Sequence, residues 1–143
     1  SEGNDSLAMY YFRNVALAND SGNKAANFNV GAVAMRYGDV ATAYERFSVV
    51  LAQDPDDNNA RIGLAIALRG LGKINEAEAE YRKVLDKDPN NAIANFNLGV
   101  LYYDHMNKKV EANSYFRKYV SLTSAPDDHI VHKYIKGVVK IRP

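Results

Sequence analysis

The stretch ANFNVG, residues 26–31, returns as ANFNLG at residues 94–99, with Val30 replaced by Leu98. The two copies begin 68 residues apart, and half of that distance, 34, leads to ARIGLA at residues 60–65. A pair made of an apolar and a small residue therefore occurs three times at a spacing of 34: Val30-Gly31, Leu64-Ala65 and Leu98-Gly99. Such agreement at one fixed period indicates an internal repeat.

Other positions follow the same period, namely Ala43 and Ala77, Phe47 and Tyr81, Val50 and Val84, and Asp54-Pro55 and Asp88-Pro89. The third copy is shifted by one residue. Its members come 35 residues after their counterparts: Ala112 after Ala77, Phe116 after Tyr81 and Tyr119 after Val84. We expect the extra residue in a turn at residues 104–109, because a turn absorbs an insertion more readily than a packed helix does.

Each copy is expected to hold two α-helices. Apolar residues recur at helical spacing in both halves of each copy, as in the series Leu64, Ala67, Leu68 and Leu71. Gly38 and Gly72 suit a left-handed cap at the end of the first helix, and the prolines after Asp54 and Asp88 suit the end of the second. Two sets of residues are expected to make the packing between helices: the small Gly31, Ala65 and Gly99, and the aromatic Phe47, Tyr81 and Phe116.

These features resemble the tetratricopeptide repeat family: the apolar–small pair, the alanine early in the second helix, the aromatic residue four later and the closing proline. The resemblance covers residues 24–125. It departs from the family pattern at Asn27, Arg61 and Asn95, where a tryptophan is frequent. It implies an all-α fold, a right-handed α-solenoid of helix-turn-helix repeats with a C-terminal capping helix. The expected divisions are an N-terminal helix at 1–23, three repeats at 24–57, 58–91 and 92–125, and the capping helix at 126–143.

The N-terminal segment has two interpretations. Residues 6–19 are predicted to form a helix, and FRNV at 12–15 echoes YRKV at 81–84. The helix is either half of a partial repeat or a cap for the array. The chain opens with SEGNDS, which has neither an initiating Met nor a signal pattern, so further repeats or a targeting signal upstream stay open.

The C-terminal segment after Ser121 is predicted to form another helix. Ser124 and Asp127 fit a capping box, and Pro126 fits the first helical turn. An array needs a last helix that covers its final apolar surface, which is the interpretation we favour. The alternative is a basic amphipathic helix that touches anionic lipid or a partner.

Composition excludes several classes of protein. The net charge of +1 argues against nonspecific nucleic-acid binding, which needs a basic surface. The chain has no cysteine, so it forms neither a disulfide nor a thiolate metal site. No apolar run approaches the roughly 18 residues of a membrane helix. We therefore expect a soluble protein without direct membrane insertion, in the cytoplasm or periplasm, with the compartment unknown.

No motif points to catalysis. The sequence has no nucleophile–base signature, no phosphate-cradling glycine loop and no metalloprotease spacing, so we expect no enzyme activity, no catalytic residue and no cofactor. His129 and His132 could face one metal ion, but a helical His pair without a third ligand is more typical of a surface, and no metal site is predicted. Glu78 and Arg82 are expected to form an i, i+4 ion pair on a solvated face.

By the resemblance, the first helices of the repeats line a concave groove that recognises extended segments. The groove positions it implies are Phe28, Asn29, Ala32, Met35, Arg36, Asn59, Ile62, Ile66, Arg69, Ile93, Phe96, Asn97, Val100 and Tyr103. Asn29 and Asn97 recur two repeats apart, and an amide side chain matches the alternating donors and acceptors of an extended backbone. The middle repeat has Gly63 there, a gap expected to admit a bulky ligand side chain. The family's clamp for C-terminal carboxylates lacks its residues here, so binding of chaperone tails is not expected.

Four hypotheses of function follow, of which the last is a metal-dependent activity. The first is a noncatalytic scaffold that binds another protein or a peptide segment in the groove, with self-association left open. The second is a soluble assembly factor of a bacterial envelope machine (pilus, secretion or outer-membrane assembly) that docks through the groove and the tail helix. The third, an RNA-reading array, is opposed by the near-neutral charge.

Overall fold

The computed structural model describes residues 2–11, 14 and 21–139, and in these ranges every regular element is helical. The elements are α1 (Glu2–Tyr11), α3 (Lys24–Arg36), α4 (Val40–Gln53), α5 (Asn58–Gly70), α6 (Ile74–Lys87), α7 (Ala92–Val100), the π-helical turn η2 (Leu101–His105), α8 (Lys109–Thr123) and α9 (Ile130–Val139). They fall into two compact units, residues 1–73 and 74–143, and each unit is described by itself.

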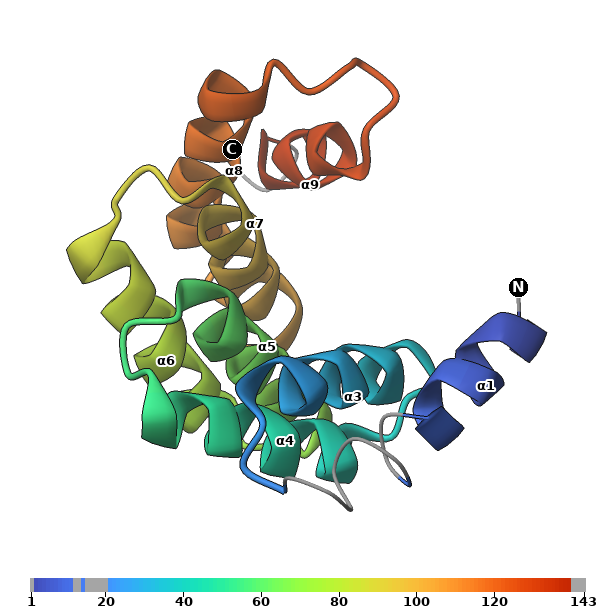
Figure 1. Cartoon of the computed structure of the whole chain (residues 1–143). Coiled ribbons are helices and arrows are strands. Elements are labelled where there is room, and N and C mark those ends of the chain that lie inside the picture. Colours follow the sequence, from blue (N-terminus) through green and yellow to red (C-terminus); the bar gives the residue numbers. More distant parts are fainter. Residues whose placement is uncertain (1, 12–13, 15–20, 140–143) are drawn as a thin grey trace. The chain divides into compact units, whose positions relative to one another are not determined.

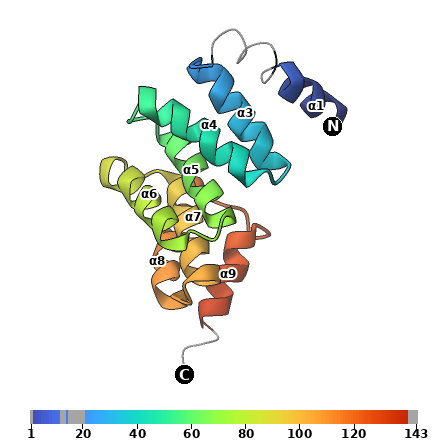
Figure 2. The same ribbon diagram turned by 90° about the horizontal axis from the view of Figure 1, so that it is seen from below.

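Helical hairpins build both units. In the N-terminal unit α3 packs on α4 and α4 on α5, and in the C-terminal unit α7 packs on α8 (Figure 1, Figure 2). The pairs α3–α4 and α7–α8 match the two helices expected in the first and third repeats, and the all-α fold class is confirmed. The repeat boundaries themselves stay a prediction.

Glycine turns join the helices of the first two repeats, as predicted. Gly38 has φ +76° and Gly72 has φ +78°, a conformation that a side chain disfavours. Gly38 N–H donates to Met35 O at 3.1 Å, and Asp39 N–H donates to Ala34 O at 2.9 Å. This pair of bonds is the Schellman motif, which satisfies carbonyls at the end of α3. Asp39 then accepts a hydrogen bond from Thr42 N–H, so the residue that closes one helix opens the next.

The Phe47 ring is the centre of packing in the N-terminal unit. It is 3% exposed and lies between two glycines of different helices, Gly31 on α3 and Gly63 on α5. A Cβ at Gly31 would sit 3.1 Å from the ring, and one at Gly63 would sit 2.6 Å from it. The gap at Gly63 is therefore filled by Phe47, and the expectation that it admits a ligand side chain is wrong.

The extra residue of the third repeat is absorbed inside the helix, not in the turn beyond it. After α7 the helix widens into η2, where Met106 N–H donates to Leu101 O at 3.1 Å and Lys108 N–H to Tyr102 O at 2.8 Å. Asn107, with φ 53°, takes the left-handed place that Gly72 has in the second repeat. A π-helical turn accommodates one additional residue without breaking the helix, which is why the insertion is tolerated here.

The last helix begins later than the sequence indicated. Ser124 is not the N-cap of α9 but the left-handed C-cap of α8, with φ 51° and its N–H donating to Val120 O at 2.9 Å. Residues 127 and 128 form a turn, and α9 starts at Ile130. His129 Nδ1 accepts a hydrogen bond from Val131 N–H at 3.1 Å, so a histidine ring performs the capping that Ser124 was expected to perform.

At the other end, α1 runs from Glu2 to Tyr11 and so begins before the predicted residue 6, because the polar opening residues form its first turn. Met9 packs against the buried Ala26 and Val30 of α3. The remainder of the predicted helix, including most of the FRNV echo, lies outside the described residues.

Candidate functional site

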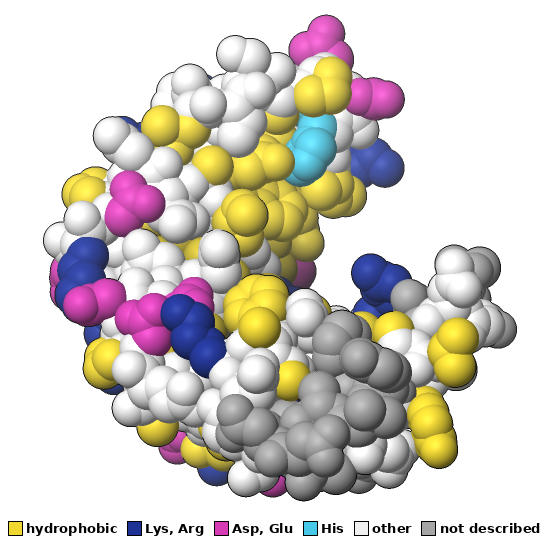
Figure 3. All heavy atoms as spheres, in the orientation of Figure 1, with side chains coloured by type: hydrophobic (Ala, Val, Ile, Leu, Met, Phe, Trp, Pro, Cys, Tyr) yellow, Lys and Arg dark blue, Asp and Glu magenta, His cyan; other side chains and the backbone are white. Residues whose placement is uncertain are grey.

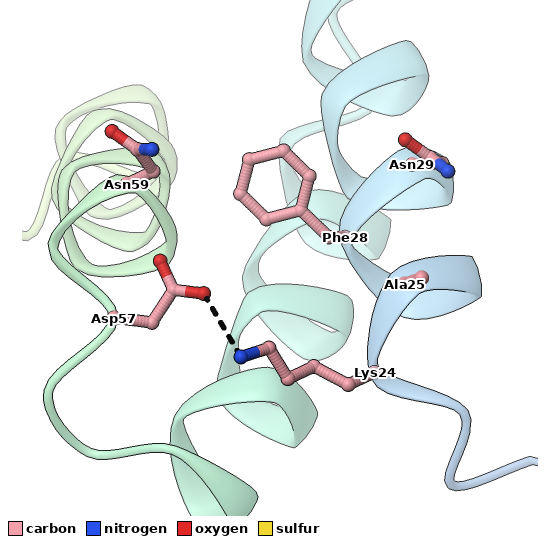
Figure 4. A pocket seen from close by; sticks show the side chains of 6 residues that line it. All are labelled: Lys24, Ala25, Phe28, Asn29, Asp57 and Asn59. Carbon is pink, nitrogen blue, oxygen red and sulfur yellow. Dashed lines mark ion pairs between the residues drawn. The ribbon is translucent and has the colours of Figure 1, made fainter.

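A hollow of about 420 Å³ opens between the first turns of α3 and α5 in the N-terminal unit. Six residues line it: Lys24, Ala25, Phe28, Asn29, Asp57 and Asn59. Figure 4 shows the Phe28 ring pointing into the space between the two helices, with Asn59 on the α5 side and Asn29 on the α3 side. The structure thus brings together three residues that the sequence nominated, Phe28, Asn29 and Asn59.

Side-chain caps start both helices at this hollow. Asn23 accepts a hydrogen bond from Ala26 N–H at 2.8 Å, and Asp57 accepts one from Ala60 N–H at 2.9 Å. Such caps satisfy amide groups that the first helical turn leaves unpaired. Because Asp57 follows the turn after α4, the repeat period itself places the second helix start beside the first.

Lys24 ties the start of α3 to the turn before α5. Its Nζ lies 2.6 Å from Asp54 Oδ2 and 3.7 Å from Asp57 Oδ2, and the pair with Asp57 is drawn as a dashed line in Figure 4. The hydrogen bond between Lys24 and Asp54 raises the pKa of Lys24 and lowers the pKa of Asp54. Both charges are solvated, so this pair orients the rim and adds little stability.

Phe28 forms the apolar wall of the hollow. Its ring is half-buried and meets Phe47 edge to face, with centroids 5.5 Å apart and planes at 72°. Aromatic pairs favour this geometry. The contact with the enclosed Phe47 holds Phe28 in place while part of its ring stays accessible.

The other nominated residues of the N-terminal unit differ in exposure. Ala32 and Arg36 are exposed, and Met35, Ile66 and Arg69 are half-buried. Ile62 is only 5% exposed. Its nomination as a binding residue is corrected, because its side chain packs in the core and presents almost no surface to a partner.

In the C-terminal unit the nominated aromatic residues are engaged with the chain's own rings. Phe96 lies 5.0 Å from Tyr119 and 5.8 Å from His129, and Tyr103 lies 4.9 Å from Tyr134 of α9, all between centroids. Figure 3 shows hydrophobic side chains gathered over α7 and α9 of this unit. His129 and the tail helix that follows it thus cover part of the aromatic surface of α7 and η2.

The remaining nominated residues of that unit are less enclosed. Ile93 is exposed, whereas Val100 and Asn97 are half-buried. Asn97 Nδ2 donates to Ile93 O at 2.9 Å, so one of its two N–H groups is used within its own helix. Asn29 and Asn97, alike in sequence, therefore differ in their surroundings.

Sequence reasoning missed Lys24, Ala25 and Asp57. The signal for Asp57 was present, since it is a capping residue directly before a helix with helical periodicity. Nothing in the sequence indicated that Lys24 would reach it, because that distance depends on how α3 packs against the turn between α4 and α5.

The two histidines of the tail serve local structure. His129 Nε2 lies 3.3 Å from Tyr119 Oη, and His132 Nε2 lies 3.2 Å from Ala125 O. Over residues 2–11, 14 and 21–139, no three His, Cys, Asp or Glu side chains cluster in a way that could hold a metal ion. Within the same ranges, no helix has both the length and the hydropathy that crossing a bilayer requires.

The comparisons with known proteins agree with this geometry. Residues 34–96 match the family model described as Tetratricopeptide repeat. Over these residues the chain shows the tetratricopeptide repeat pattern. A search of curated proteins found no match.

Several solved structures share the fold. A crystal structure of MamA superposes with a TM-score of 0.82 at 20% identity, covering 97% of this chain and 79% of that one. MamA 41-end from Desulfovibrio magneticus RS-1 superposes with a TM-score of 0.77 at 23% identity, covering 88% of this chain and 70% of that one. TTC0263, a thermophilic tetratricopeptide repeat protein in Thermus thermophilus, superposes with a TM-score of 0.76 at 17% identity, covering 96% of this chain and 74% of that one. At these identities the likeness shows the fold alone.

The 34-residue period explains why the hollow lies where it does. The first helices of consecutive repeats, α3 and α5, start at equivalent positions of the period, so their capping residues and first turns come together. Residues 29 and 59, which differ in their position within the repeat, are joined by this stacking and not by periodicity.

Proposed function

We propose that this protein is a noncatalytic scaffold that binds an extended segment of a partner protein along the first helices of its repeats. The observation that carries the proposal is the hollow between α3 and α5, open to solvent and lined by an aromatic ring, two amides and an ion pair. The other groove residues nominated from the N-terminal unit, apart from the buried Ile62, belong to the same proposed surface.

The chemistry of the hollow suits a peptide. Phe28 offers an apolar wall on which one apolar or aromatic side chain of a partner packs. Asn29 and Asn59 each carry a donor and an acceptor, which pair with the N–H and C=O groups of an extended backbone. Lys24 and Asp57, already paired with each other, add a polar rim without a strong preference for ligand charge.

The test begins with selection of binders from a library of displayed random peptides on the purified protein. Selected peptides are then titrated against the wild type and against Asn29→Ala/Asn59→Ala. Losing two peptide hydrogen bonds of about 1 kcal/mol each weakens binding roughly tenfold or more. The melting temperature is expected to stay unchanged, because both side chains are exposed.

Asn75→Ala is the matched control, since it removes an exposed amide from α6 that does not line the hollow. It should leave peptide affinity as in the wild type. Equal affinity for the wild type and the double variant would contradict the site, and failure to select any peptide would contradict the function.

A further inference from the structure

A polar side chain at one position of the repeat ties the preceding turn to the first helix. In the first repeat Asn27 Nδ2 donates to Ser21 O at 2.9 Å, in the second Arg61 Nη2 donates to Pro55 O at 2.6 Å, and in the third Asn95 Nδ2 donates to Pro89 O at 3.1 Å. Donors and acceptors both recur every 34 residues. The same side-chain hydrogen bond therefore recurs at one position of the repeat, and its surroundings can be compared between repeats.

In the first repeat both the nitrogen and the oxygen of this side-chain amide have hydrogen-bond partners. Asn27 is fully buried, its Nδ2 donates to Ser21 O and to Asn23 O, and its Oδ1 accepts a hydrogen bond from Arg46 Nη1 at 3.3 Å. Arg46 also pairs with Glu45, 3.1 Å away. A guanidinium group with a carboxylate beside it thus satisfies the buried amide oxygen.

In the third repeat the guanidinium is missing. The residue that matches Arg46, 34 and then 35 positions further on, is Tyr115, whose ring packs edge to face on Tyr102. Asn95 is 4% exposed, and its Nδ2 hydrogens go to Pro89 O and to Asn91 O at 2.9 Å. Within the part of the chain that the structure describes, Asn95 Oδ1 receives no hydrogen bond.

A cavity of about 280 Å³ lies beside this amide, lined among others by Asn95, Tyr115, Asp86 and Leu85. Because Asn95 makes the same Nδ2 bonds as Asn27, its Oδ1 faces the side where Arg46 stands in the first repeat. The amide oxygen is an acceptor that no side chain of the described residues uses, so a ligand group that donates hydrogen bonds can pair with it. The exposed Asp86 carboxylate supplies the negative partner, and Tyr115 and Leu85 supply apolar walls for a flat group.

Arg82 is the cation at the cavity, and its charge is already matched. Its Nε donates to Glu78 Oε1 at 3.0 Å, and its Nη2 donates to Tyr102 Oη. Burial acts to raise the pKa of Glu78, but hydrogen bonds from Tyr102 and Arg82 overcome it and hold that pKa below its ordinary value, so Glu78 is ionised at neutral pH. Because the Arg82 guanidinium is bonded to Glu78 and Tyr102, Asp86 and Asn95 are available to interact with a ligand.

We propose that this cavity of the C-terminal unit binds the guanidinium group of an arginine side chain from a partner protein, in the place that Arg46 occupies in the first repeat. Guanidinium is planar and carries several donors, so it reaches Asn95 Oδ1 and Asp86 together and stacks on Tyr115. The site is separate from the hollow of the N-terminal unit, and it adds recognition of one residue type to whatever the first helices bind.

The test is an NMR titration of the isotope-labelled full chain with N-acetyl-arginine amide. The side-chain amide signals of Asn95 are expected to shift and saturate. N-acetyl-citrulline amide, which has the same shape without the charge, and N-acetyl-lysine amide are expected to bind several-fold more weakly. Acetate serves as the probe for the opposite interpretation, in which Arg82 takes a carboxylate.

Two variants make the test specific. Tyr115→Arg supplies the guanidinium from the chain itself and should abolish the shifts, whereas Tyr115→Phe keeps the ring and should retain them. Asp86→Asn is expected to weaken binding about threefold, as for a partly exposed ion pair. It also keeps the proposal testable if Tyr115→Arg does not fold.

Four results would overturn the proposal: no saturable shift at Asn95, equal binding of the lysine compound, preferential binding of acetate, or undiminished binding by Tyr115→Arg. Asn29→Ala/Asn59→Ala should bind N-acetyl-arginine amide like the wild type. Loss of peptide binding at the hollow and loss of arginine binding here are therefore separate outcomes.

Discussion

Replacing Gly63 by alanine tests the central packing arrangement of the N-terminal unit. The new Cβ would lie 2.6 Å from Cε2 and Cζ of Phe47 and 2.9 Å from Cδ2. Carbon atoms pack best at about 3.5–4.0 Å, so the methyl group would overlap the ring by about 1 Å. The ring has little room to move away, because its opposite edge faces Gly31, where an added Cβ would lie only 3.1 Å from it.

The expected cost follows from two opposing terms. Overpacking of a filled core costs about 1–3 kcal/mol, and replacing glycine by alanine within a helix returns up to about 1 kcal/mol. With the full propensity gain, Gly63→Ala should therefore lower the free energy of unfolding by up to about 2 kcal/mol, or the melting temperature by up to about 6 °C. Gly31→Ala, whose overlap is only a few tenths of an ångström, should be close to neutral.

Urea unfolding followed by circular dichroism measures both variants, and each is repeated in a Phe47→Leu background. Leucine lacks the ring atoms that the new methyl meets, so Gly63→Ala should become stabilising there, by up to about 1 kcal/mol from helix propensity. The reasoning is refuted if Gly63→Ala stabilises the wild type, or if its effect is the same with Phe47 and with leucine.

Two further predictions concern the C-terminal unit. Burial and a hydrogen bond to Glu78 raise the pKa of Tyr102 well above its usual range, so the folded state keeps a proton that the unfolded state loses near pH 10. The free energy of unfolding therefore falls as the pH rises above that point, by up to about 1.4 kcal/mol per pH unit. Tyr102→Phe should remove this part of the slope in urea unfolding at alkaline pH, and an unchanged slope would contradict the hydrogen-bond network of Tyr102, Glu78 and Arg82. Ser124 adopts φ 51° at the end of α8, so Ser124→Gly should raise the free energy of unfolding by about 1 kcal/mol. If urea unfolding instead gave a lower free energy of unfolding for the variant than for the wild type, the serine side chain and not the backbone conformation would matter there.

The sequence determined the repeat architecture because the features that define it are local and periodic. Gly38 and Gly72 occupy the predicted turns, since only a residue without Cβ adopts a positive φ at no cost. Phe47 and Gly31 meet as expected, because one period places a ring opposite a small residue. The pair Glu78 and Arg82 forms at 3.0 Å, because residues four apart on a helix are neighbours.

Tertiary packing decided what the period cannot express. The Phe47 ring from α4 fills the space beside Gly63, which the sequence alone does not show. Ile62 is buried because of the elements that pack around α5. The approach of Lys24 to Asp57, which shapes the hollow, joins residues with no common position in the repeat. Local propensity and periodicity act along the chain, whereas burial, cavities and the partners of a polar atom depend on three-dimensional neighbours that a single sequence does not state.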